Sequence, residues 1–273
     1  MHADAFSLQR YFQRIGFEGE ARTDIGAIAE MMRRQLFTVP FENGDVQSGK
    51  GVSLDPEVIV DKILGRGRGG YCYEVNGLFA MALQALGVPY RFVAARPMFY
   101  PAKRPRTHMA VVARVEGADW LCDLGFGSYG IRAPLCLAEL DVAVRQDGDA
   151  FMLGREGGDG YVLKALVDGT WTSQYAFDLA PQDWIDFVPA NYFNSTHPDT
   201  IFVQKLLVIV HDPAGRTILC GDMLTTITHG RVEKRRIAPE ERVPLLSSVF
   251  GLRLDACSSD RHEHAPTGPR SIQ

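Results

Sequence analysis

A cysteine, a histidine and an aspartate lie in sequence settings suited to nucleophilic catalysis. Cys72 follows a glycine-rich segment and precedes an apolar helical pattern, whereas His108 and Asp123 lie in two β-like segments downstream. A thiolate, an imidazole that activates it and a carboxylate that orients the imidazole form a nucleophilic triad. The three residues therefore predict an enzyme that carries a group covalently on Cys72.

The segment before Cys72 favours a reactive thiol. Gly67, Gly69 and Gly70 permit a tight loop into a helix, and the free N–H groups at a helix start favour negative charge, here on the sulfur. A single cysteine taken alone is more often a buried structural residue. The histidine and the aspartate downstream favour the catalytic interpretation.

His108 is the preferred base among the seven histidines. It begins the apolar segment His-Met-Ala-Val-Val-Ala, and the next predicted strand contains Asp123, so a hairpin would hold imidazole and carboxylate together. His197, in Asn-Ser-Thr-His-Pro, is the main alternative. The other five lie in predicted tails or beside predicted turns: His2, His211, His229, His262 and His264.

The composition is that of an ordinary globular protein. The 273 residues are 46% hydrophobic and 23% charged, with a net charge of −4, which disfavours nucleic acid or an anionic membrane as a partner. Five cysteines without CxxC spacing indicate neither a disulfide framework nor a zinc site. The sequence shows no secretory signal and no membrane-spanning stretch, so we expect a cytoplasmic protein with a reduced thiol.

Apolar residues at three- and four-residue spacing predict helices in the first third of the chain. Thr23 or Asp24 would cap the second helix, Asp55 would cap the third, and Gly87 would end the fourth. The predicted helices are residues 6–15, 25–36, 55–64 and 72–86.

From residue 88 the periodicity becomes that of strands, which indicates a sheet or small barrel followed by a mixed region. The strands predicted for the sheet are residues 90–95, 108–115, 120–124, 151–153, 161–166 and 171–177. After Pro181 we expect a turn or helix near Trp184, strands at 205–211 and 223–228, a solvated charged strand at 231–236 and a helix at 239–250.

Five segments together resemble the arylamine N-acetyltransferase family. They are Val-Pro-Phe-Glu-Asn (39–43), Arg-Gly-Gly-Tyr-Cys-Tyr-Glu-Val-Asn (68–76), Thr-His-Met (107–109), Asp-Leu-Gly-Phe-Gly (123–127) and Asn-Ser-Thr-His-Pro (194–198), in matching order and spacing. The resemblance implies an α+β, cysteine-protease-like architecture in three parts. These are a helical bundle at residues 1–87, a β-barrel at 88–180 and an α/β lid at 181–257, followed by a flexible tail at 258–273.

The resemblance also implies a reaction and a site. Members of the family move an acetyl group from acetyl-CoA to arylamines, arylhydrazines or arylhydroxylamines by a ping-pong mechanism without a metal, a chemistry of xenobiotic metabolism. Their triad matches Cys72, His108 and Asp123. The matching acceptor-pocket positions are Phe41 and Phe126, and the matching CoA-contact positions are Thr107, Gly127 and Phe202.

Other residues near the site are assigned from the sequence itself. Tyr71 adjoins the nucleophile and is predicted to line the acceptor pocket, while Arg68 and Glu74 are predicted to pair with each other or with nearby backbone. The loop before His108 carries three basic residues that either meet the CoA phosphates or form a solvated basic loop: Lys103, Arg104 and Arg106.

Three departures from the family pattern concern acceptor preference. Gly44 replaces a leucine, Gly77 replaces a serine or threonine, and a proline shortly after Gly-Phe-Gly is absent. Three other functions are compatible with the same triad residues and fold. They are those of a cysteine hydrolase or transglutaminase-type enzyme, a related amide synthase, and a non-catalytic binding module. The intact triad disfavours the binding module, because binding alone does not require all three residues.

Overall fold

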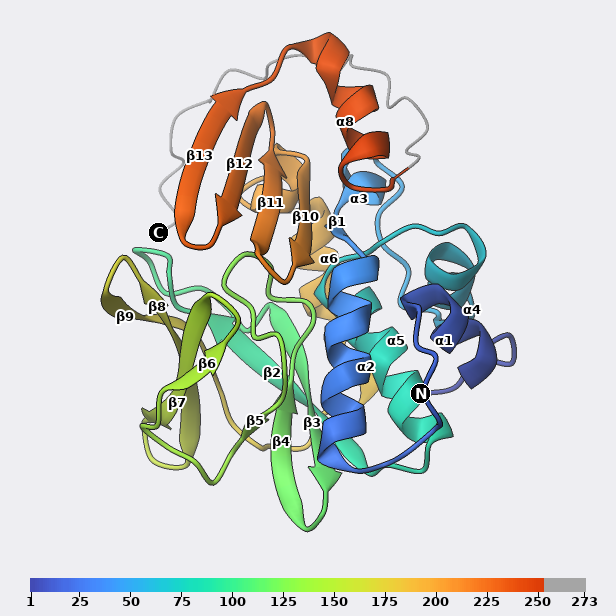
Figure 1. Ribbon diagram of the computed structural model, residues 1–273, viewed down its shortest axis with the longest axis vertical. Helices are drawn as coiled ribbons and strands as arrows, with labels where there is room; N and C mark the ends of the chain where they lie inside the picture. The colour runs from blue at the N-terminus through green and yellow to red at the C-terminus, as the bar shows by residue number, and fades with distance from the viewer. Residues whose placement is uncertain (253–273) are drawn as a thin grey trace, which may run out of the picture.

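The computed structural model describes residues 1–252, which fold into three parts (Figure 1). A group of helices comes first, a curled antiparallel sheet second, and a smaller sheet with helices, here called the lid, last. This is the three-part α+β architecture that the family resemblance implies. The final residues of the predicted lid, 253–257, and the predicted tail, 258–273, lie outside the described residues.

Capping groups and glycines set the ends of the first helices. Asp24, one of the two predicted caps, accepts a hydrogen bond from the N–H of Ala27, and Gly87 has φ +72° after the last of these helices, as predicted. The predicted helix at 55–64 is an α-helix that continues as a π-helical turn. The elements are α1 (Leu8–Ile15), α2 (Ile25–Thr38), α3 (Gly44–Gln47), α4 (Pro56–Val60), the π-helical turn Asp61–Gly65 and α5 (Cys72–Ala85).

Helix α5 lies at the centre of the main core. Its side chains are buried without interruption from Cys72 to Leu83, because α1 packs against it from one side and strands of the second part from the other. A helix that is apolar on nearly all faces is stable only inside a protein. The first residue of this buried helix is the predicted nucleophile.

The second part is a nearly closed barrel. Within the described residues its eight strands follow the antiparallel order β5-β4-β3-β2-β9-β8-β7-β6. The short β5 and β6 were not predicted. The strands are β2 (Tyr90–Pro97), β3 (His108–Val115), β4 (Ala118–Cys122), β5 (Leu135–Cys136), β6 (Val144–Gln146), β7 (Asp149–Glu156), β8 (Gly160–Val167) and β9 (Thr170–Phe177).

The β3–β4 hairpin explains how His108 and Asp123 meet. Val111 pairs with Cys122, so one further step along β4 would bring Asp123 opposite Ala110. Residues opposite each other share a face of the sheet, and His108 lies on that same face two residues from Ala110. The strand predicted at 120–124 ends at Cys122, so Asp123 lies just beyond it.

The lid contains a second antiparallel sheet with its own small apolar core under α8. Strand β1 (Phe41–Glu42), from the first part of the chain, pairs with β10 and so ties the lid to the helices. Strand β11 was not predicted, and Pro244 is tolerated because it lies in the first turn of α8. The elements are the 3₁₀ turn Trp184–Phe187, α6 (Val188–Thr196), α7 (Ile201–Gln204), β10 (Leu207–Asp212), β11 (Gly215–Cys220), β12 (Met223–Thr228), β13 (Arg231–Arg236), the 3₁₀ turn Pro239–Glu241 and α8 (Arg242–Ser248).

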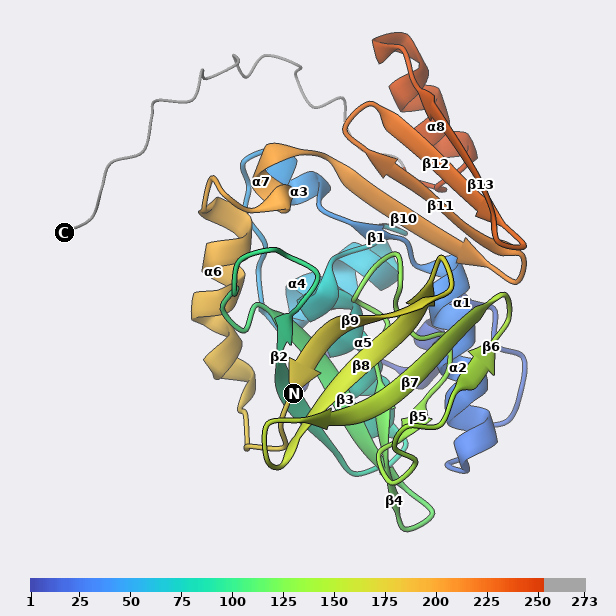
Figure 2. The same ribbon diagram turned by 90° about the vertical axis from the view of Figure 1, so that its left-hand side faces the viewer.

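Helix α6 lies beside the loop that connects β2 to β3 (Figure 2). The carboxamide of Asn194 on α6 donates a hydrogen bond of 2.8 Å to the carbonyl of Thr107, directly before His108. Among residues 1–252, none of the helices has the length and apolar character needed to cross a membrane.

Candidate active site

The glycine-rich loop brings Cys72 to the first position of α5. A Cβ on Gly69 would lie 1.9 Å from the carbonyl oxygen of Pro40, and the N–H of Gly70 donates to that oxygen at 3.2 Å. Only glycine permits this backbone approach. The predicted tight entry into the helix is confirmed, and Cys72 is only 3% exposed.

His108 and Asp123 form a buried pair. The His108 Nε2 and Asp123 Oδ2 atoms are 2.7 Å apart, with the two residues 5% and 0% exposed. Burial by itself lowers the pKa of His108, but the Asp123 charge and hydrogen bond, together with the Cys72 thiol, raise it to about 10. The structure therefore brings the three predicted residues together, with the imidazole between carboxylate and sulfur.

Asn76 holds Asp123 in place from the same helix that carries Cys72. Its Nδ2 donates to the Asp123 Oδ1 at 3.0 Å and to the Met109 carbonyl at 2.7 Å, and its Oδ1 accepts from the N–H of Leu124 at 2.8 Å. Sequence reasoning did not assign this role to Asn76. A polar amide one turn after Cys72 in an otherwise buried helix was the available signal.

Two aromatic rings pack against the imidazole. The ring centroids of Phe126 and Tyr175 lie 5.1 and 5.0 Å from that of His108. Tyr175 is fully buried, and burial together with the nearby Asp123 carboxylate raises the pKa of its hydroxyl well above the usual value. The site thus excludes water from the histidine face, which strengthens its electrostatic interactions. Sequence reasoning did not identify Tyr175.

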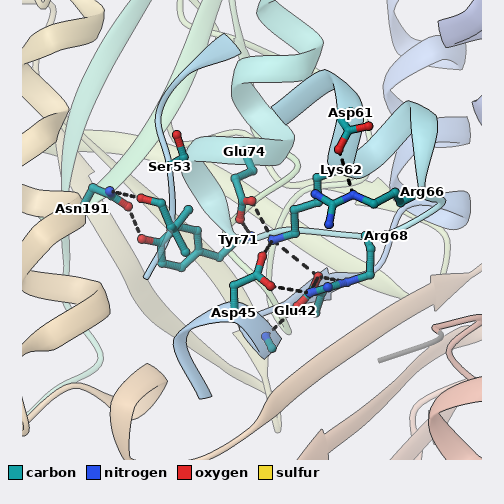
Figure 3. A network of polar contacts seen from close by, with 12 residues as sticks. Glu42, Asp45, Ser53, Asp61, Lys62, Arg66, Arg68, Tyr71, Glu74 and Asn191 are labelled. Carbon is teal, nitrogen blue, oxygen red and sulfur yellow. Dashed lines mark hydrogen bonds and ion pairs between the residues drawn. The ribbon is translucent and has the colours of Figure 1, made fainter. Parts of the chain in front are cut away.

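A buried ion cluster lies beneath the start of α5 (Figure 3). The Lys62 Nζ contacts Glu74 Oε1 at 2.7 Å and Asp45 Oδ2 at 2.6 Å, and Arg68 Nη2 contacts Glu42 Oε1 at 2.7 Å. The predicted direct pairing of Arg68 with Glu74 is wrong, because the two residues bind different members of this cluster. The alternative partner for Glu74, nearby backbone, is confirmed.

Glu74 links this cluster to the nucleophile. Its Oε2 accepts a hydrogen bond of 3.0 Å from the N–H of Tyr71, so the carboxylate caps the helix directly before Cys72. Burial raises the pKa of Glu74 to about 7, against the opposing effect of Lys62. Burial by itself lowers the pKa of Lys62, but the three carboxylates around its ammonium raise it above the usual value.

A narrow cleft opens above Cys72 and His108. Its volume is about 80 Å³, which suits a single aromatic ring or a short acyl group. Of the predicted binding residues, the structure places these in its wall: Phe41, Phe126, Thr107, Phe202 and Arg104.

Four other predicted binding residues lie elsewhere. Tyr71 is fully buried, with its hydroxyl on the Asn191 carboxamide, so it belongs to the core and not to the cleft. Lys103 and Arg106 line a neighbouring groove of about 600 Å³, where Arg106 pairs with Asp178 at 2.5 Å. Gly127 lies just beyond the cleft wall with φ +94°.

The alternative residues for catalysis are not at the cleft. His197 is partly exposed and stacks on Phe193 at 4.5 Å, while His211, which was predicted to border a turn, is 5% exposed within the structure. Cys122 and Cys136 are buried away from the cleft, and burial raises the pKa of Cys122 far above the usual value. Among residues 1–252, no group of three or more metal-ligating side chains is arranged to hold a metal ion.

Comparisons with known proteins agree with this geometry. A family profile described as N-acetyltransferase matches residues 24–258. The Salmonella typhimurium protein named arylamine N-acetyltransferase / N-hydroxyarylamine O-acetyltransferase is 31% identical over 247 residues, which cover 90% of this chain and 86% of the relative.

Solved structures show the same fold. The Mycobacterium abscessus arylamine N-acetyltransferase superposes with a TM-score of 0.87 at 32% identity, covering 93% of this chain and 92% of that one. The Mycobacterium marinum arylamine N-acetyltransferase in complex with CoA superposes with a TM-score of 0.84 at 31% identity, covering 90% of this chain and 92% of that one. The chain belongs to the arylamine N-acetyltransferase family of enzymes.

Proposed function

We propose that this enzyme moves an acetyl group from acetyl-CoA to arylamines, arylhydrazines or arylhydroxylamines through an acetyl-Cys72 intermediate. The observation that carries the proposal is the His108–Asp123 pair at 2.7 Å, next to a cysteine at a helix start. The Mycobacterium marinum relative binds CoA, and the Salmonella relative is named for both N- and O-acetyl transfer. Acceptors of this kind place the reaction in xenobiotic metabolism.

In the first half-reaction, His108 takes the thiol proton of Cys72 and the sulfur attacks the thioester carbonyl of acetyl-CoA. The raised pKa of His108 favours the imidazolium, which Asp123 stabilises. Cys72 is the first residue of α5, so its backbone N–H has no acceptor within the helix. This N–H would donate a hydrogen bond to the tetrahedral oxyanion. The C–S bond to CoA then breaks, and the departing sulfur takes the proton from His108.

In the second half-reaction, the acceptor nitrogen or oxygen attacks the acetyl-Cys72 carbonyl. His108 removes the proton from the attacking atom and returns it to the Cys72 sulfur as the thioester bond breaks. The products are the acetylated acceptor and the free thiol. The aromatic walls, Phe41 and Phe126, suit a flat aromatic acceptor, because ring stacking adds to simple burial.

We infer that acetyl-CoA contacts both the cleft and the neighbouring groove, with its pantetheine arm in the cleft and its phosphates near the basic residues of both. Thr107 and Phe202 line the cleft and would contact the pantetheine arm, with Gly127 at its edge. Arg104 faces the cleft, whereas Lys103 and Arg106 face the groove. All three would meet CoA phosphates through charge-assisted hydrogen bonds.

The test measures CoA release from acetyl-CoA with and without an arylhydrazine. We expect acceptor-dependent release that falls by more than about a thousandfold in Cys72→Ala, because the covalent route is lost. Cys220→Ala, which removes a thiol from the lid, is the matched control and should keep full activity. Substantial transfer by a folded Cys72→Ala chain contradicts the proposal. Release without acceptor would instead indicate a hydrolase, and no release from any acyl-CoA would favour an amide synthase or a binding protein.

A further inference from the structure

A second ion cluster, built on two buried arginines, lies where the barrel, the lid and α2 meet. We call it the clasp and define it as Arg132, Asp147, Asp149 and Arg216. Arg132 contacts Asp149 Oδ2 at 2.5 Å and Asp147 Oδ2 at 3.2 Å, and Arg216 contacts the same Asp149 oxygen at 2.7 Å. The clasp joins β11 of the lid to the β6–β7 turn and the start of β7 in the barrel.

The two arginines of the clasp are buried, whereas its two aspartates reach the surface. Arg132 and Arg216 are 1% and 3% exposed, and removing such charges from water costs free energy unless their partners are close. Arg33 of α2 binds Asp147 through both terminal nitrogens, at 2.6 and 2.7 Å, so the first part of the chain is attached as well. None of these residues takes part in the acetyl transfer described above.

Arg216 extends from the clasp onto the loop that follows Asp123. Its Nε donates to Ser128 Oγ at 3.2 Å, and its guanidinium carbon lies 4.5 Å from the centre of the Tyr129 ring. The loop, residues 124–131, starts next to Asp123 and ends at Arg132, itself a member of the clasp. Its far half is therefore held by charges, while its near half is held by Asp123 and Asn76.

This loop forms part of the catalytic cleft. Phe126 lines the cleft, with its ring centre 5.1 Å from that of His108. A Cβ on Gly125 would lie 2.5 Å from the Cys72 Cα, so the loop backbone packs directly on the nucleophile. A shift of the loop would therefore move an aromatic wall of the cleft, and small displacements at reacting centres have large effects on rate or binding.

We propose that Arg216 is a positioning residue of the lid that holds the loop at 124–131 and thereby fixes Phe126 as a wall of the acceptor site. The proposal rests on the proposed function for the identity of the acceptor. His108 and Asp123 are held by the β3–β4 hairpin and by Asn76, which the clasp does not contact. Loss of Arg216 therefore acts on acceptor binding more than on the chemical step.

The experiment compares Arg216→Met with the parent enzyme in two assays. We expect the KM for an arylamine to rise about tenfold with kcat changed less than about threefold, since Phe126 loses its fixed position. The second assay needs no acetyl transfer: it measures the rates at which N-phenylmaleimide and N-methylmaleimide alkylate Cys72, with Cys72→Ala as the blank. The ratio of the alkylation rate with N-phenylmaleimide to the rate with N-methylmaleimide should fall about threefold or more.

Matched variants separate positioning from simple loss of stability. Arg236→Met removes an exposed lid arginine that pairs with Asp222, and it should change neither assay. In a Phe126→Leu background, Arg216→Met should change the KM less than about twofold, because the residue through which it acts is already gone. An equal effect in both backgrounds overturns the route through Phe126.

The remaining outcomes also decide the proposal. A folded Arg216→Met chain that keeps the parental KM and alkylation ratio overturns it. If that chain does not fold, Tyr129→Leu and Ser128→Ala each remove one loop contact while leaving the ion pairs in place, and parental ratios in both overturn it. If the parent enzyme acetylates no amine, the proposed function fails, while the alkylation ratio still tests the role of Arg216.

Discussion

Two histidines in this protein are equally buried, yet their pKa values are shifted in opposite directions. His108 and His211 are each 5% exposed. Asp123 and Cys72 surround His108 and raise its pKa to about 10 against the effect of burial. Burial and two guanidiniums, Arg132 and Arg216, lower the pKa of His211 to about 3. Burial lowers the pKa of both histidines, and the charges of Asp123 and Cys72 reverse that effect only at His108.

The difference separates the histidine that we propose to be catalytic, His108, from one in a structural setting, His211. His108 holds its proton between a carboxylate and a thiol, so it can pass that proton to and from the reacting sulfur. His211 stays neutral near physiological pH, and its Nε2 has no hydrogen-bond partner within residues 1–252. A neutral ring is compatible with the two guanidiniums whose charges act on it, whereas a protonated ring would repel both of them.

The largest expected effect comes from removing the negative charge of Asp123, which raises the pKa of His108. Asp123→Asn keeps the shape of the side chain but removes the carboxylate, so the pKa of His108 should fall and its tautomer is no longer set. We expect kcat/KM for acetyl transfer to fall about 10⁴-fold. Circular dichroism should show an unchanged fold, and a loss of less than about tenfold would mean that Asp123 is not the orienting carboxylate.

Lys62, like His108, is a buried cation whose pKa is raised by neighbouring carboxylates. Lys62→Met leaves Glu42, Asp45 and Glu74 without their shared ammonium, so we expect a loss of about 3–5 kcal/mol in the free energy of unfolding. Urea denaturation measures it. Lys50→Met, at an exposed position, is the control. A loss below about 1 kcal/mol for Lys62→Met would show that the carboxylates become protonated at little cost.

The contact between His108 and Asp123 was predictable from the sequence because it depends on the pairing of two adjacent strands. The turn at Glu116-Gly117 joins two adjacent strands, so period-two geometry alone brings His108 and Asp123 to one face. The tight loop into α5 was predictable for the same reason, since the glycines that form it directly precede Tyr71 and Cys72 in the sequence.

The ion clusters were not predictable in the same way. Arg68 and Glu74 are close in sequence, yet their partners come from three other segments, those of Glu42, Asp45 and Lys62. Only the tertiary fold brings these segments together. The burial of His211 was not predictable either: it borders a turn, as predicted, yet it is 5% exposed, and the charges of Arg132 and Arg216 from other parts of the chain act on its ring.

A pH titration of stability tests His211 directly. Because its folded pKa lies below the unfolded value of about 6.5, the unfolded chain binds more protons in acid, so stability falls as the pH drops from about 6.5 toward 3. His211→Gln should remove about 2 kcal/mol of the loss between pH 6.5 and 5. His108 acts in the opposite direction, since its stabilisation is complete below about 6.5 and is lost as the pH rises toward 10. A parental acid slope in His211→Gln would mean that the pKa of His211 in the folded protein is close to its unfolded value.

The smallest effect is expected at His197, a partly exposed histidine and the main alternative base predicted from the sequence. Its side chain is 43% exposed, and its Nδ1 lies 4.0 Å from the exposed carboxylate of Asp199, a pair that solvent screens. His197→Ala should therefore change the free energy of unfolding by less than about 0.5 kcal/mol. Its ring stacks on Phe193, which lines the cleft, so a reduction in kcat/KM of up to about threefold is consistent with altered packing. A loss of a hundredfold or more, measured under the conditions used for Asp123→Asn, would identify His197 as the base. A catalytic histidine in this fold would then need neither burial nor a carboxylate held at 2.7 Å, the two features that His108 has.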